Sequence, residues 1–197
     1  MMQKTNKVHK MTLTAILMAT ILVMSFTPLG YLRVGPVAIT FLTIPVVIGA
    51  VLLGPWYGAF LGAVFGATSF STCFGADPMG VALLSIDPVA TFFTCMVPRI
   101  LIGVVTGLLF RALCRRGHNN AFVLILTTLV GCLTNTVLFV SAVIFFFQST
   151  YFGGDSLGNI IVMFFTVNAL LEVVVCGLVA AGCSKALSSV MLRKISA

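Results

Sequence analysis

The chain has 197 residues, of which 60% are hydrophobic and only 8% are charged, with a formal net charge of +7. Because soluble domains carry about 25% charged residues, this composition predicts an integral membrane protein and excludes an ordinary soluble domain. The length allows one compact domain, residues 1–197. In a membrane chain the positive charge indicates orientation in the bilayer rather than binding to nucleic acid.

Six segments are apolar enough to be membrane helices, since about 20 apolar residues cross the hydrocarbon core. They are residues 11–28, 37–53, 57–72, 89–113, 121–147 and 158–190. The third is short, and Pro45 interrupts the second. The first follows basic residues, as a signal peptide does, but it lacks an A-x-A cleavage site, so we expect a retained helix. The predicted fold is an all-α, compact bundle of six transmembrane helices.

Charged residues divide between the two sides of this bundle. One side holds nine of the eleven Lys and Arg: Lys4, Lys7, Lys10, Arg111, Arg115, Arg116, Lys185, Arg193 and Lys194. The loops of the other side contain Asp77, Asp87 and Asp155, with Arg33 as the only basic residue. By the positive-inside rule we expect both termini in the cytoplasm of a multi-pass cell-membrane protein.

Small residues recur at intervals of four. Gly54, Gly58, Gly62 and Gly66 form one such stripe, and Gly103 and Gly107 form another. On a helix this spacing lets a neighbouring backbone approach closely, so we expect packing inside the bundle. Ala15 and Ala19 repeat the pattern in the first segment, and spacing alone leaves open whether they pack internally or meet a partner helix. Gly54 and Pro55 predict a tight turn between the second and third segments.

Few polar residues interrupt the helices, and each is costly, since a central charge costs about 2.5–3.5 kcal/mol on insertion scales. Arg99 follows Pro98 inside the fourth segment, Asn135 stands between Thr134 and Thr136 in the fifth, and Asn168 and Glu172 belong to the sixth. Their similar depths predict one buried polar site that binds a ligand. The alternative is a structural ion pair between Arg99 and Glu172.

The sequence contains no motif that indicates catalysis or metal binding. The chain has no G-x-S-x-G, H-E-x-x-H or paired-aspartate motif and no phosphate loop of the form G-x-x-x-x-G-K-[ST]. We therefore expect no catalytic residues, no cofactor and no hydrolysis of ATP by this chain. The six cysteines form no C-x-x-C pair, and only two histidines occur, which predicts neither a metal site nor a disulfide framework.

Four stretches, in this order, resemble the substrate-binding subunits of energy-coupling factor (ECF) vitamin transporters, especially the pantothenate and cobalamin branch. They are "TAILMAT", "IPVVIGAVLLGPWYGAFLGAVFGATSF", "VPRILIGVVTGLLFR" and "GCLTNTVLF". The resemblance covers about residues 11–180. It implies a six-helix prokaryotic membrane subunit that captures a vitamin from outside, and the first choice of vitamin is pantothenate. It also implies partners, namely a membrane coupling subunit and two cytoplasmic ATPases.

The same resemblance assigns roles to individual residues. The docking motif of the family, Ala-x-x-x-Ala, corresponds to Ala15 and Ala19. The substrate pocket of the family corresponds to Arg99, Asn135, Asn168 and the loop around Tyr31 to Arg33. We also expect Thr134 and Glu172 to bind substrate, since they lie beside these residues in the fifth and sixth segments. Two departures concern the choice of vitamin: Trp56 stands where a basic turn is usual, and the loop 72–89 differs from pantothenate versions.

Two alternatives remain at this point. The ligand of the binding subunit could be another vitamin, such as cobalamin. The chain could instead be a stand-alone secondary transporter in which Glu172 carries a coupling proton. Inverted repeats would favour the second alternative, and the sequence has no convincing repeat.

Overall fold

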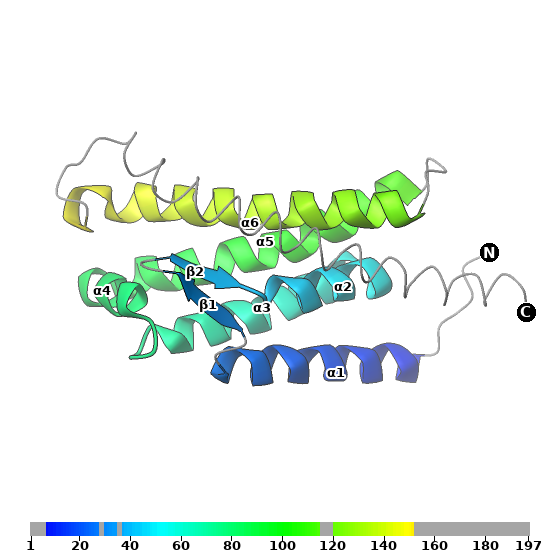
Figure 1. The fold of residues 1–197 in the computed structure, drawn as a ribbon, viewed down its shortest axis with the longest axis horizontal. Helices are drawn as coiled ribbons and strands as arrows, with labels where there is room; N and C mark the ends of the chain where they lie inside the picture. Colours follow the sequence, from blue (N-terminus) through cyan, green and yellow to red (C-terminus); the bar gives the residue numbers. More distant parts are fainter. Residues whose placement is uncertain (1–6, 28–29, 35–36, 115–119, 152–197) are drawn as a thin grey trace, which may run out of the picture.

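The structure is a computed structural model that describes residues 7–27, 30–34, 37–114 and 120–151. The predicted sixth segment, residues 158–190, lies outside the described residues, and so do Asn168 and Glu172. Almost all of the described chain is helical. Five helices, α1 (Lys7–Phe26), α2 (Thr43–Leu53), α3 (Pro55–Thr72), α5 (Pro88–Cys114) and α6 (Asn120–Tyr151), run along the long axis of the molecule (Figure 1).

Three of these helices are long and apolar enough to cross a membrane. They are α1, α5 over Pro88–Leu113 and α6 over Val123–Phe146. The predicted helical segments 11–28, 57–72, 89–113 and 121–147 correspond to α1, α3, α5 and α6, so the sequence places these four helices correctly.

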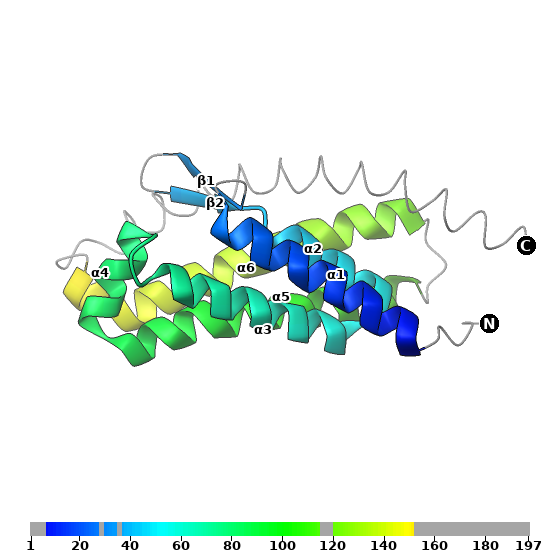
Figure 2. The ribbon, with the colours of Figure 1, turned by 90° about the horizontal axis from the view of Figure 1, so that it is seen from below.

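The second predicted segment, 37–53, is only partly helical. Its first residues form β2 (Val37–Thr40), which pairs antiparallel with β1 (Tyr31–Val34), Tyr31 opposite Thr40. The prediction of an all-α chain is therefore wrong at this hairpin, where alternating β-branched residues favour strands. In both views the hairpin extends from the last turn of α1 toward α4 (Figures 1 and 2). Helix α2 has 11 residues, and Pro45 lies in its first turn, where a missing N–H costs nothing.

The predicted loop 72–89 contains a further helix, α4 (Pro78–Ile86). Asp77 caps it by accepting a hydrogen bond from the Gly80 amide at 3.3 Å. Asp87 in turn accepts from the amides of Val89 and Ala90 at 2.9 and 3.1 Å, where α5 begins. Each aspartate precedes a proline, which favours the first position of a helix because its missing N–H would be unbonded there. The two Asp-Pro pairs therefore start consecutive helices.

The glycine stripe of α3 packs directly on α5. A Cβ atom at Gly58 would collide with the carbonyl oxygen of Gly103, and one at Gly62 would collide with that of Arg99. Gly54 adopts φ of +108°, which favours glycine, and Pro55 begins α3. The prediction of close internal packing and of a turn at Gly54 is confirmed. The backbone of α5 is thus fixed against α3 at the level of Arg99.

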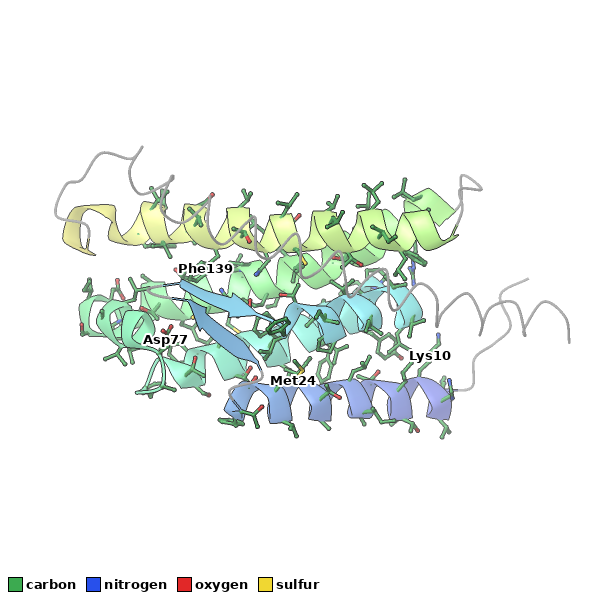
Figure 3. All side chains as sticks on the ribbon, in the orientation of Figure 1. Lys10, Met24, Asp77 and Phe139 are labelled. Carbon is green, nitrogen blue, oxygen red and sulfur yellow. The ribbon has the colours of Figure 1, made fainter. Side chains whose placement is uncertain are left out.

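Two clusters of buried apolar side chains lie beside this contact. The first joins α1, α2, α3 and α5 through Ile21, Leu42, Val46, Leu61, Phe65 and Ile102. The second joins α4, α5 and α6 through Leu83, Ala90 and Val143, with Phe139 packed against it. We call the end of the molecule at which α4 lies the α4 end. Lys10 and Asp77 lie toward opposite ends (Figure 3).

Candidate binding site around Arg99

Arg99 is a buried cation in the interior of α5. Its side chain is only 7% exposed, and at a rise of about 1.5 Å per residue it lies roughly 16 Å from the start of the helix at Pro88. No ion pair joins it to Asp77 or Asp87, the two carboxylates of the described part. A buried charge is costly unless hydrogen bonds or a counter-charge compensate it. The surroundings of Arg99 therefore define the candidate site.

The neighbouring proline explains one hydrogen bond of the guanidinium group. Pro98 has no backbone N–H, so it cannot donate to the carbonyl oxygen of Thr94, its partner four residues earlier in the helix. Arg99 Nη1 donates to this same oxygen at 3.0 Å. The adjacent residues Pro98 and Arg99 thus act together, because the arginine supplies a donor to the carbonyl that the proline leaves without one.

Two aromatic rings contact the guanidinium group. Its Cζ atom lies 4.6 Å from the ring centroid of Phe139 on α6 and 5.5 Å from that of Phe65 on α3. Both distances are within the roughly 6 Å over which a ring face attracts a cation. Figure 3 places Phe139 between α6 and the other helices. The rings partly replace the water that a buried guanidinium group lacks.

Several buried polar atoms of the described residues have no hydrogen-bond partner. Arg99 Nε, Asn135 Oδ1 and Thr94 Oγ1 are among them. The Arg99 and Asn135 side chains are buried, and that of Thr94 is 1% exposed. Buried polar groups are usually paired, and each unpaired one is costly. A guanidinium N–H together with an amide oxygen can receive a polar ligand that both accepts and donates hydrogen bonds.

Arg99 and Asn135 lie at the same interface, between α5 and α6. Gly131 of α6 lies against Thr106 of α5, because a Cβ atom added at Gly131 would be 2.5 Å from Thr106 Oγ1. The ring of Phe139 of α6 contacts the guanidinium group of Arg99 of α5. Asn135 lies one turn from Gly131 and one turn from Phe139, so these three share a face of α6. Asn135 therefore faces α5 at a level between Thr106 and Arg99, one helical turn from Phe139, whose ring contacts Arg99.

The other predicted binding residues have different places. Thr134 donates to the carbonyl oxygen of Val130 at 2.7 Å, so its hydroxyl already bonds within α6. The backbones of Tyr31 and Arg33 belong to β1, and their side chains are outside the described ones. Whether Glu172 pairs with Arg99 stays an open prediction, because Glu172 and Asn168 lie outside the described residues.

The sequence interpretation placed Pro98 next to Arg99 but missed its effect on the helix, and it missed Thr94, Phe65 and Phe139 as partners of Arg99. The Pro98 signal was present, since a proline inside a helix always leaves the carbonyl four residues earlier without its donor. Phe139 follows Asn135 by one turn, which also placed it on the same face. Nothing in the sequence distinguished Phe65 from the other phenylalanines of the chain.

The cysteines differ from the prediction at one position. Cys73 and Cys95 are free, buried thiols with sulfur atoms 3.9 Å apart. Cys132 on α6 is disulfide-bonded. The sequence predicts no disulfide framework, and it does not anticipate this bond at Cys132.

Ala15 and Ala19 lie on the exposed side of α1. Apolar residues continue this exposed side, with Val8, Met11, Val23 and Phe26 between 64% and 73% exposed. The opposite side of α1 packs on the first cluster through Leu17, Met18, Ile21 and Met24. The close-approach pattern of Ala15 and Ala19 thus faces away from the helices of the described bundle.

Comparison with known proteins gives the family. The ECF transporter, substrate-specific component family matches residues 9–183, which include α2 to α6 and all of α1 except its first two residues. The pantothenic acid transporter PanT of Lactococcus lactis subsp. cremoris (strain MG1363) is 30% identical over 183 residues, 87% of this chain and 90% of that protein. The pantothenate transporter PanT of Leuconostoc mesenteroides subsp. mesenteroides is 33% identical over 110 residues, 53% of this chain and 52% of that protein. The chain belongs to the family of substrate-specific components of ECF transporters.

Proposed function

We propose that this chain binds pantothenate at the outer side of the cell membrane for import by partner subunits. Two relatives that carry the name of pantothenate transporters support this choice of vitamin. Pantothenate has a carboxylate, an amide and two hydroxyl groups, so it needs both a cationic partner and neutral hydrogen-bonding partners. The proposal includes no catalytic step and no cofactor.

The observation that carries the proposal is the unpaired edge of Arg99. Its Nε has no hydrogen-bond partner, although the side chain is buried, and Asn135 Oδ1 is equally unpaired. A planar guanidinium edge suits a carboxylate, with which it can form two parallel hydrogen bonds. Asn135 would then accept from an N–H or O–H of the ligand. Asn168, Glu172, Thr134, Tyr31 and Arg33 belong to the proposed pocket as predictions from the sequence and the family resemblance.

The proposed architecture is one domain, residues 1–197, with six transmembrane helices, cytoplasmic termini and a multi-pass position in a prokaryotic plasma membrane. The placement of charges supports this orientation. Lys10 lies toward one end of the molecule, and Asp77 lies near α4 at the other (Figure 3). Arg111 sits beside Gly54 at the turn between α2 and α3. With basic residues in the cytoplasm, the α4 end faces outward, and Arg99 lies in the outer half.

The proposed partners are a membrane coupling subunit and two cytoplasmic ATPases. Membership of the ECF family supports a coupling module of this kind. The exposed Ala15 and Ala19 offer a smooth helix surface that another helix could approach closely. Binding energy for the vitamin would come from this chain, and the energy for import would come from the partners.

Direct ligand binding tests the proposal. The purified full chain in lipid nanodiscs is titrated with labelled pantothenate, and unlabelled pantothenate and cobalamin are then added as competitors. Saturable binding that only pantothenate displaces is expected. Displacement by cobalamin at lower concentration would assign another vitamin to the site, and no binding of either compound would contradict the proposed pocket.

A further inference from the structure

Pro98 and Arg99 share one backbone carbonyl, which carries an inference beyond the proposed ligand. In a regular helix the N–H of residue 98 would bond to the carbonyl oxygen of Thr94, and proline removes that donor. Arg99 Nη1 donates a hydrogen bond to this carbonyl oxygen instead, at 3.0 Å. The guanidinium group is therefore attached to its own helix at one nitrogen, at a level where the side chain is only 7% exposed.

This attachment decides which part of the guanidinium group stays available. Nη1 is used by Thr94, and Phe139 and Phe65 lie beside the group at 4.6 and 5.5 Å from Cζ. Nε remains buried and unpaired. All guanidinium N–H groups lie in one plane, so the unpaired Nε donor is offered edge-on. A carboxylate accepts hydrogen bonds in this plane. Its hydrogen bonds with the guanidinium group are stronger than those of a neutral hydroxyl, because both partners are charged.

We propose that Pro98 is a positioning residue for ligand recognition: by leaving the Thr94 carbonyl without a helical donor, it holds Nη1 of Arg99 and presents the Nε edge to a carboxylate. The proposal rests on the proposed function in one respect, since it takes the ligand to be an acid. Its structural part, the dependence of the Thr94 carbonyl on Arg99, is independent of any ligand.

A cycle of substitutions on the ligand-free protein tests the structural part. Melting temperatures are measured for the wild type, Arg99→Met, Pro98→Ala and the double variant, all as full chains in the same nanodiscs. Arg99→Met should lower the melting temperature of the wild type more than that of Pro98→Ala, because the alanine N–H satisfies the Thr94 carbonyl without arginine. Additive shifts would show that Pro98 and Arg99 do not share this acceptor and would overturn the proposal.

A ligand pair tests the positioning role. Pantothenate is compared with panthenol, in which a primary alcohol replaces the carboxylate. In Pro98→Ala the affinity for pantothenate should fall about tenfold, the size of a charge-assisted hydrogen bond, while the affinity for panthenol changes little. The melting temperature should stay equal or rise, since alanine is a far better residue than proline inside a helix. A purely structural proline would instead lower stability and weaken both ligands equally.

Pro88→Ala is the matched control. Pro88 lies on the same helix, but at its first position, where no carbonyl depends on its N–H. This variant should bind both compounds like the wild type. Equal losses for the two compounds in Pro98→Ala would overturn the positioning role. If the wild type binds no pantothenate at all, the proposed function fails, while the melting-temperature cycle still decides whether Pro98 and Arg99 are coupled.

Discussion

Gly62 on α3 faces the carbonyl oxygen of Arg99 on α5 so closely that a Cβ atom at Gly62 would collide with it. The contact joins two backbones, and neither can move aside as a side chain would. Close packing between helices therefore holds the backbone of Arg99 in place, just as Thr94 and Phe139 hold its side chain. The packing stripe and the candidate site meet at this one residue.

Gly62→Ala should separate α3 from α5 and destabilise the protein. Overpacking typically costs about 1–3 kcal/mol of unfolding free energy, and backbone contact favours the upper part of this range. We expect a lower melting temperature together with weaker ligand binding, because the shift occurs at Arg99. Ala67→Leu, on the exposed side of the same helix, is the control. A Gly62→Ala protein with unchanged stability would contradict the close contact.

Arg99→Lys should weaken pantothenate binding by about 1–3 kcal/mol, the range of a charge-assisted hydrogen bond, because lysine keeps the charge but loses the planar fork. Arg99→Ala should weaken it further. Titration calorimetry measures both, with Arg111→Lys on the exposed end of α5 as the control. Unchanged affinity in both variants, with a lower melting temperature, would favour the structural ion pair with Glu172 instead.

Phe139→Leu should remove the ring that lies 4.6 Å from the Arg99 Cζ atom. Desolvated cation–ring contacts contribute about 2 kcal/mol, and exposed ones about 0.5–1 kcal/mol. We expect pantothenate affinity to fall within this range, and Phe139→Tyr to retain most of it because the ring remains. Phe145→Leu, on the same helix at a position that is 82% exposed, should have no effect. Equal affinities for all four proteins would show that the ring does not support the site.

Ala15→Trp and Ala19→Leu should block the close approach of another helix to α1. Both alanines are exposed, so the isolated chain should fold and bind pantothenate normally, while uptake in cells that contain the coupling subunit and both ATPases should fail. Thr20→Leu, also exposed on α1, is the control. Loss of folding and binding in the Ala15 or Ala19 variants would mean that this surface packs internally.

The energy source separates a binding subunit from a secondary transporter. Cells with this chain alone should bind pantothenate without accumulating it, and accumulation should appear when the coupling subunit and both ATPases are added. Uptake should survive collapse of the proton gradient while ATP is maintained, and Glu172→Gln should leave this uptake largely intact. Gradient-dependent accumulation by the chain alone, abolished by Glu172→Gln, would establish the secondary transporter.

The class of protein and the helices α1, α3, α5 and α6 can be predicted from the amino-acid sequence alone. Apolar composition and the length of a span are local properties, so they can be summed along the chain without knowledge of its neighbours. The four-residue spacing of Gly54, Gly58, Gly62 and Gly66 likewise predicts a smooth helix face. The bond from Arg99 to the Thr94 carbonyl is also local, since all its atoms lie within two turns of one helix, but the sequence interpretation did not find it.

Contacts between segments that are distant in the sequence depend on how the helices pack against one another. That Phe139 and Phe65 meet Arg99, and that Asn135 lies one turn from this contact, depends on the register of α6 and α3 against α5. The register follows from side-chain packing along whole helices, as at Gly62 and Gly131. Residues 37–40 show the same dependence, because a short apolar run becomes a strand or a helix according to the partner it finds, and here that partner is β1.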